Sequence, residues 1–199
     1  MTKPQASPVW CADFSRLLIV ITGSINAAFA PSWLSWLKLS FPELTVRIVV
    51  TRSALRFVTP QALAVISGTS VMTDEWQSVA EPGSAHTEMS EAADAILIYP
   101  ATVHYVGRLA LGIADSPSLL TIACTQVPVV VAPSFPPGGW DSPVTKEHLE
   151  RLAGRSNVTV IPPVPGFSFT TRQENGSFPP PLPRLLHTLG WIGTAGAGQ

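Results

Sequence analysis

The sequence is short of charge. Aspartate, glutamate, lysine and arginine together make up 13% of its 199 residues, whereas charged residues supply roughly a quarter of an ordinary soluble chain. A monomer with so few charges would leave much apolar surface in water, so the composition predicts a homo-oligomer that buries this surface. The net charge of −1 and the lack of a basic patch argue against a nucleic-acid partner.

Long apolar runs and a signal sequence are lacking as well. Every apolar run is interrupted by Gly, Pro, Arg or Asp before it reaches the roughly 18 residues that span a bilayer, so we expect no membrane span. The opening stretch, MTKPQASPVWCADFSR, contains no apolar signal core. The sequence therefore predicts a cytoplasmic protein.

Cysteine is scarce. Cys11 and Cys124 lie far apart and form no Cys/His cluster, so neither a zinc site nor a disulfide framework is expected, and we predict no metal. Cys124 follows the apolar run Leu119-Leu120-Thr121-Ile122-Ala123, and this position predicts a buried structural thiol.

What the sequence does contain is an alternation of short apolar runs with segments of helical periodicity. The expected strands are 17–21, 46–50, 95–99, 127–132 and 158–161, and the expected helices are 27–39, 54–58, 60–67, 106–113, 145–153 and 184–189. Pro100 is expected to end the third strand because proline cannot donate to a ladder. The alternation predicts an α/β sandwich with a mainly parallel sheet.

The chain divides into four parts by composition. Residues 1–15 are expected to form a loose N-terminal leader, and residues 16–161 the α/β domain. Residues 162–183 are rich in proline and too long for a simple connector, which predicts a clamp or lid over a substrate. Residues 184–199 are expected to form a C-terminal helix and a frayed tail.

Three turns that follow expected strands are rich in small and hydroxyl residues: residues 23–26 (Gly-Ser-Ile-Asn), 51–53 (Thr-Arg-Ser) and 100–102 (Pro-Ala-Thr). Parallel strands bring their carboxyl ends to one edge, where ligands bind. Free N–H groups and hydroxyls at that edge favour a phosphate-bearing cofactor, although small residues also simply make tight turns. The sequence matches neither the GxGxxG fingerprint nor the P-loop.

Two histidines are candidates for chemistry. His86 precedes the third strand and could serve as a general base, since a neutral imidazole accepts a proton near pH 7; a surface histidine in a polar segment is the plainer interpretation. His104 lies just after the third turn, where it could contact a ligand or cap a helix.

Taken together, Ser24-Ile25-Asn26, Thr51-x-Ser53-x-x-x-Phe57, His86 and Pro100-Ala101-Thr102 resemble the homo-oligomeric flavin-containing cysteine decarboxylases, over about residues 16–161. The resemblance implies a flavodoxin-like, Rossmann-like three-layer sandwich, bound FMN (FAD is also possible), and assembly as a homotrimer or homododecamer. It implies cofactor contacts at Gly23, Ser24, Ile25, Thr51, Ser53, Phe57, Pro100, Ala101, Thr102 and His104.

The same resemblance assigns catalytic positions. His86 falls on the active-site histidine, and Asn26 falls beside the flavin and substrate. The implied substrate contacts are Pro136, Gly138, Gly139, Trp140, Phe167 and Phe169. Pro136 stands where the family usually has the asparagine that binds the substrate carboxylate, and proline has no donor. The N–H groups of Gly138 and Gly139, or the side chain of His104, are candidates to replace that asparagine.

The resemblance is strongest to the enzymes that decarboxylate the C-terminal cysteine of lantibiotic precursor peptides. Phosphopantothenoylcysteine decarboxylases carry a cysteine in their clamp, whereas residues 167–178 contain none. We therefore expect oxidative decarboxylation to an enethiol, with a Cys-terminated precursor peptide and lanthionine synthetase enzymes as partners. The alternatives are a non-catalytic flavin-binding partner protein, a phosphopantothenoylcysteine decarboxylase and a flavin prenyltransferase.

Overall fold

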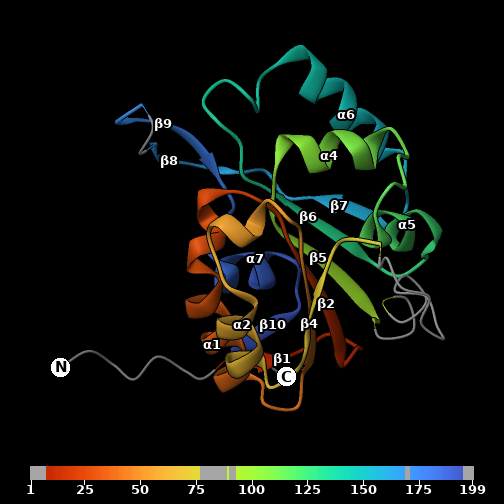
Figure 1. Ribbon diagram of the computed structural model, residues 1–199, viewed down its shortest axis with the longest axis vertical. Helices are drawn as coiled ribbons and strands as arrows, with labels where there is room; N and C mark the ends of the chain where they lie inside the picture. The colour runs from red at the N-terminus through yellow and green to blue at the C-terminus, as the bar shows by residue number, and fades with distance from the viewer. Residues whose placement is uncertain (1–7, 77–88, 90–92, 169–170, 195–199) are drawn as a thin grey trace.

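The computed structural model describes residues 8–76, 89, 93–168 and 171–194. Its centre is a six-stranded sheet in the order β4-β3-β2-β5-β6-β7 (Figure 1), and every neighbouring pair of strands is parallel. The strands are β2 (Arg16–Ile21), β3 (Thr45–Val50), β4 (Val71–Thr73), β5 (Ala95–Ala101), β6 (Val129–Pro133) and β7 (Val158–Val160). The predicted α/β fold is confirmed.

Helices cover both faces of this sheet, which makes a three-layer sandwich (Figure 1). One face carries α1 (Ala30–Ser40), α2 (Pro60–Ser67) and α7 (Leu182–Thr188), and the other carries α4 (Val103–Ala110), α5 (Pro117–Cys124) and α6 (Pro143–Ala153). Two 3₁₀ helices, η1 (Ile25–Phe29) and η2 (Ala54–Arg56), follow β2 and β3. Among the described residues, no helix is long and apolar enough to cross a membrane.

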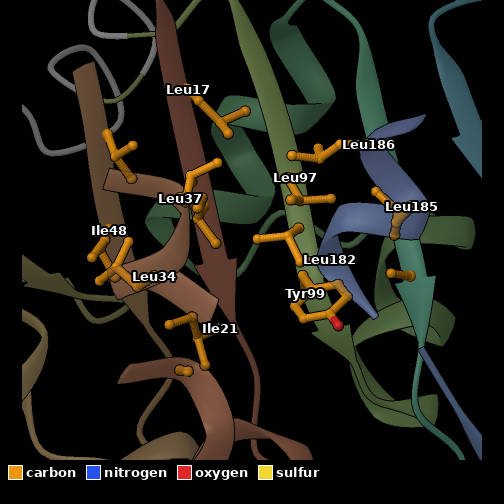
Figure 2. Packing of buried hydrophobic residues seen from close by; sticks show 14 of the residues in the cluster. Leu17, Ile21, Leu34, Leu37, Ile48, Leu97, Tyr99, Leu182, Leu185 and Leu186 are labelled. Atoms are coloured by element: carbon orange, nitrogen blue, oxygen red, sulfur yellow. The ribbon is translucent and has the colours of Figure 1, made fainter. Parts of the chain in front are cut away.

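The central strands are apolar throughout because both of their faces are covered. In β2, Leu17, Ile19 and Ile21 pack toward α1 and α7, whereas Leu18 and Val20 pack toward α4 and α5. The first of these two cores is shown in Figure 2, where side chains of β2, β3 and β5 meet leucines of α1 and α7. The alternation of side chains along a strand explains how one short run supplies both cores.

The order of strands reverses next to β2. From β2 the chain proceeds outward to β3 and β4, and it then returns to add β5, β6 and β7 on the other side. In an open parallel sheet, the crevice at the carboxyl ends of the two strands flanking such a reversal is where ligands bind. The fold thus places a ligand site at the carboxyl ends of β2 and β5.

Several expected boundaries differ from the observed ones. Strand β5 continues through Pro100 to Ala101, because the carbonyl of Pro100 still accepts a hydrogen bond from the Thr22 N–H at 3.2 Å although proline donates none. The helix expected at 27–39 is divided into η1 and α1, since Pro31 suits the first turn of a helix but not its interior. Helix α5 was not predicted, although Pro117 marks its first turn.

The two ends of the described chain pair with each other. Strand β1 (Pro8–Trp10) lies in the expected loose leader, yet it pairs antiparallel with β10 (Ile192–Thr194), which lies in the expected frayed tail. Aromatic rings explain the difference: Trp10, Phe14 and Trp191 pack edge to face or tilted, with centroids 4.8–6.3 Å apart. The prediction that Cys124 is buried is wrong. It is exposed because it occupies the last position of α5.

Candidate functional site

The three polar turns meet at the carboxyl edge of the sheet, as predicted. The hydroxyl of Thr22, at the end of β2, accepts the N–H of Thr102 at 2.9 Å and donates to the carbonyl of Pro100 at 2.7 Å. The N–H of Thr51 donates to the carbonyl of Ile21 at 3.0 Å. These bonds join the ends of β2, β3 and β5 into one polar rim.

Gly23 allows two of these turns to approach closely. A Cβ atom at this position would lie 2.4 Å from the Cβ of Ser53 and 2.8 Å from its backbone carbon, which is closer than non-bonded carbon atoms approach. Any other residue would therefore push the turn after β2 away from the turn after β3. The glycine therefore allows the turn after β2 to lie in direct contact with the turn after β3.

A hydrogen-bonded cluster continues the rim beyond β5. The hydroxyls of Ser24 and Ser134 lie 2.6 Å apart, and the side-chain amide of Asn26 donates to Ser134 at 2.9 Å. Ser134 directly follows β6, and its N–H donates to the carbonyl of Ala101 at 2.8 Å. Ser134 was not predicted as a site residue. Its position after the apolar run of β6, at the same edge as the other turns, is the signal that could have identified it.

Two cavities open along this edge. The first has a volume of about 830 Å³ and combines hydroxyl groups with charges of both signs. It is lined by Thr22, Thr51, Arg52, Ser53, Arg56, Asp74, Glu75, Trp76, Thr102, His104, Tyr105, Arg108, Asp115 and Ser116. The guanidinium of Arg108 pairs with Asp115, and this hydrogen bond is the main cause of the lowered pKa of that carboxyl group.

Asp74 lines the first cavity and forms hydrogen bonds with the start of α5. It follows β4 and is buried, and its carboxylate accepts the hydroxyl of Ser116 at 2.9 Å and the N–H of Ser118 at 2.8 Å. The hydroxyl of Ser118 lies 2.7 Å from that of Tyr105 on α4. Burial raises the pKa of Tyr105 far above its usual value, so this phenol stays protonated. Asp74 thereby holds α4 and α5 in register with the sheet.

An Asp74→Ala variant is expected to lower the free energy of unfolding by about 2 kcal/mol, because it leaves the buried N–H of Ser118 without its acceptor. For a chain of this size that corresponds to a fall of roughly 4–8 °C in Tm, measured by circular dichroism. The neighbouring Glu75→Ala is the matched control. Among the described residues, Glu75 forms only an exposed pair with Arg52 at 3.7 Å, so its loss should change stability by less than about 0.5 kcal/mol. Equal effects of the two variants would contradict this role of Asp74.

The second cavity, of about 750 Å³, is more apolar. It is lined by Gly23, Ser24, Ile25, Phe57, Thr102, Val103, His104, Ser134, Phe135, Pro136, Pro137, Gly139, Ser142, Thr145, Ser168, Gly176 and Phe178. Thr102 and His104 line both cavities, so the two spaces meet at the first turn of α4.

A hairpin borders the second cavity. Strands β8 (Val164–Ser168) and β9 (Gln173–Phe178) pair antiparallel and extend away from the sheet (Figure 1). The hairpin is attached at its base, where the N–H of Phe135 donates to the carbonyl of Ser177 at 2.8 Å. The ring of Phe178 lies where Cβ atoms on Gly166 and Gly176 would stand, at 2.5–2.6 Å. The two glycines thus let an aromatic ring lie flat across the hairpin beside the cavity.

The structure brings together most of the residues expected to contact a cofactor. Thr51, Ser53, Thr102 and His104 line the first cavity, and Gly23, Ser24, Ile25, Phe57, Thr102 and His104 line the second. Pro100 and Ala101 are buried in β5 and act through their backbone rather than by lining a cavity. Asn26 lines a separate groove beside α1 and contacts this site through two hydrogen bonds, from its side-chain amide to Ser134 and from its N–H to the hydroxyl of Ser24.

The expected substrate residues are divided in the same way. Pro136 and Gly139 line the second cavity, whereas Gly138 and Trp140 lie in the same turn without lining it. Trp140 packs against Phe135 instead, with ring centroids 6.1 Å apart. Phe167 is 46% exposed on β8 and does not line the cavity. His86 and Phe169 lie outside the described residues, so their predicted roles stay predictions.

A doubly wound parallel sheet with a polar rim at its switch point defines a nucleotide- or flavin-binding protein. Comparison with known proteins identifies the family. Residues 11–180 match the model of the Flavoprotein family. The chain belongs to this family, as the resemblance of its motifs predicted.

Two relatives and a solved structure show where in the family it lies. The chain is 36% identical over 159 residues to the cypemycin cysteine dehydrogenase (decarboxylating) of a Streptomyces species, covering 80% of this chain and 82% of the relative. It is 33% identical to the coenzyme A biosynthesis bifunctional protein CoaBC of Haemophilus influenzae, covering 76% of this chain but 37% of that longer protein. The crystal structure of the FMN-dependent cysteine decarboxylase TvaF from thioviridamide biosynthesis superposes with a TM-score of 0.65 at 29% identity, covering 73% of this chain and 88% of that chain.

The residues at the switch point fit a flavin. The first cavity offers Arg52, Arg56 and Arg108 together with the hydroxyls of Thr51 and Ser53, which suit a phosphate and a sugar chain. The second cavity offers an apolar, aromatic lining that suits a planar ring. Gly23 lines the second cavity and has no side chain, so the backbone of the first turn can approach a ligand closely.

Proposed function

We propose that this protein is a flavin-dependent decarboxylase that acts on the C-terminal cysteine of a ribosomally made precursor peptide. The observation that carries the proposal is the junction of a polar, arginine-lined cavity with an apolar one at the switch point of the sheet. The first suits the phosphate end of FMN, and the second is large enough for a flat ring together with the end of a peptide. The cysteine decarboxylase relatives support this assignment.

The bound flavin would supply the acceptor for the two electrons that the cysteine loses. The protein supplies position, proton transfer and exclusion of water. The paired hydroxyls of Ser24 and Ser134, held by Asn26, leave one hydroxyl hydrogen to donate at the edge of the second cavity. His86 is proposed to take the proton of the substrate thiol, and the hairpin β8–β9 is proposed to close over the peptide end.

The composition of the hairpin region indicates which product is released. Residues 162–183 contain no cysteine, so this segment offers no thiol that could return two electrons to the product. We therefore propose that the reaction ends at the enethiol, the precursor of an aminovinyl-cysteine ring. A phosphopantothenoylcysteine decarboxylase would instead release a product that has lost CO₂ alone.

A pool of synthetic pentapeptides ending in cysteine tests the proposal. Aerobic incubation with the purified yellow protein should produce peptides lighter by one CO₂ and two hydrogens, detected by mass spectrometry. Loss of CO₂ alone would indicate the coenzyme A branch, and prenylated flavin after addition of a prenyl phosphate would indicate a flavin prenyltransferase. A protein that holds flavin but converts no member of the pool would be a binding partner rather than this enzyme. Acid release and chromatography of the flavin distinguish FMN from FAD.

We further propose that the protein assembles with copies of itself and works in the cytoplasm beside lanthionine synthetase enzymes. Large apolar side chains on and around α1 and α2 support the self-assembly, because Phe29, Leu39 and Val65 are 56%, 82% and 71% exposed. Light scattering during gel filtration should give the mass of a trimer or a dodecamer. A monomer at micromolar concentration would contradict this part of the proposal.

A further inference from the structure

The chain that leaves the hairpin β8–β9 is held on both sides of Phe178. On the hairpin side, the backbones of Ser177 and Phe135 exchange two hydrogen bonds, of 2.8 and 3.4 Å. On the other side, the carbonyl of Pro180 accepts a hydrogen bond from the hydroxyl of Tyr99 at 2.8 Å. Phe178 lies between these two anchors and lines the second cavity. The position of this part of the cavity wall therefore depends on both anchors.

The two legs of the hairpin differ in burial. On the entry leg, Pro162 is exposed and Pro163 is half-buried, whereas Pro179 and Pro180 on the exit leg are both buried. Proline donates no backbone hydrogen bond, so a proline leg can be held only through its carbonyl groups and by packing. The exit leg has both kinds of support, and it is the leg that fixes where the hairpin stands.

Tyr99 is suited to hold this leg because its own position is fixed. It is 5% exposed near the end of β5, in the core between the sheet and α7 (Figure 2). The ring of Trp33 on α1 packs edge-on against it, with centroids 5.2 Å apart and an interplanar angle of 88°. Burial raises the pKa of the phenol, so Tyr99 keeps its proton and remains a donor. Tyr99 itself lines neither cavity, so it can affect a ligand there only through the groups that it holds.

We propose that Tyr99 is a positioning residue of the peptide site, which holds the ring of Phe178 in the wall of the second cavity through the carbonyl of Pro180. This inference rests on the proposed function for the nature of the ligand, the apolar end of a peptide. The ring of Phe178 fills the space that Cβ atoms on Gly166 and Gly176 would need, so ring and hairpin move together. A gap of less than 1 Å beside an apolar ligand already removes a large part of the contact energy.

Tyr99→Phe removes the hydroxyl and keeps the ring, so it tests the hydrogen bond alone. Thr69→Val is the matched control, because the hydroxyl of Thr69 donates to the carbonyl of Val46 at 3.1 Å and Thr69 lines neither cavity. Each variant loses one hydroxyl–carbonyl hydrogen bond, and each should lower Tm by roughly 2–4 °C. Phe178→Leu, alone and combined with Tyr99→Phe, completes a double-mutant cycle.

The first measurement is hydrogen exchange of the flavin-loaded protein without peptide. The amides of Ser177 and Phe178 should exchange roughly 3- to 10-fold faster in Tyr99→Phe than in wild type, the factor that one neutral hydrogen bond contributes to a local opening. In Thr69→Val they should exchange at the wild-type rate.

The second measurement is peptide binding, followed by the change in flavin absorbance after the flavin content of each variant has been checked. The probe is the pentapeptide that wild type converts best, synthesised with serine in place of the reacting cysteine so that no thiol can be oxidised. Tyr99→Phe should weaken binding by roughly 3- to 10-fold, and Thr69→Val should leave it unchanged. In the Phe178→Leu background, Tyr99→Phe should change the affinity by less than about twofold, because the ring that it positions is gone.

Unchanged exchange at Ser177 and Phe178 in Tyr99→Phe would overturn the inference without reference to any peptide. Equal effects of Tyr99→Phe and Thr69→Val would do the same, as would a loss of peptide affinity of equal size with and without the ring of Phe178. Loss of flavin from Tyr99→Phe would make Tyr99 a support of the cofactor instead. Failure of the proposed function is distinguishable, since wild type would then convert no Cys-ending peptide while hydrogen exchange still decides whether Tyr99 positions Phe178.

Discussion

A Gly23→Ala variant is expected to fold but to bind flavin roughly 10- to 100-fold more weakly, as overpacking at a rigid contact costs about 1–3 kcal/mol. The added methyl group would lie 2.4 Å from Ser53 Cβ and 2.8 Å from its backbone carbon, so the turn itself must move. Movement of either turn displaces Ser53, which lines the first cavity, or Ser24, which lines the second. Fluorescence titration of the apoprotein with FMN gives the affinity.

Gly107→Ala is the matched control for this variant. Gly107 lies within α4, and of the residues that the structure describes, a Cβ there would meet only the imidazole of His148, at an ordinary 3.4 Å. Alanine in place of a helical glycine should stabilise the protein by about 0.5–1 kcal/mol and leave flavin affinity unchanged. Flavin binding by Gly23→Ala at the wild-type level, with both variants folded, would show that the contact between the two turns does not shape the site.

The central sheet could be predicted from the sequence because most of its strands are short, continuous apolar runs. Leu17 to Ile21 and Val46 to Val50 are short apolar runs that only a strand covered on both faces needs. Strand β4, of only Val71 to Thr73, is too short for such a signal. The pairing of β1 with β10 joins residues 8–10 to residues 192–194, and nothing local in either segment indicates a partner so distant in the chain.

The candidate site was predictable to the extent that it follows from topology. Turns after parallel strands must share an edge, so Ser53 and Thr102 could be placed together without any structure. Asp74 and Ser134 could not be placed at the site from the sequence, because their hydrogen-bond partners lie far along the chain. Asp74 binds Ser118, and Ser134 binds Asn26. The position of His104 in both cavities is also a tertiary property, because residues from several separate turns line each cavity.

The largest effect is expected for His86→Asn, which should keep its flavin and lose turnover by about 10²- to 10⁴-fold, the usual contribution of a general base. His86 is proposed to act on the substrate thiol and not on the flavin, so its loss should not affect cofactor affinity. The proton of the substrate thiol would then have no neutral imidazole to receive it. The rate is measured as product formed from the converted pentapeptide, at equal flavin content.

His187→Asn serves as the control, because His187 is exposed in the last turn of α7 and lines neither of the two cavities. It should retain wild-type turnover. Normal turnover by His86→Asn would remove this residue from the chemistry and assign the proton to another group. Gly23→Ala is expected to weaken flavin binding, whereas His86→Asn is expected to slow turnover at equal flavin content. Comparing the two variants therefore separates the contribution of the rim to flavin binding from the contribution of His86 to catalysis.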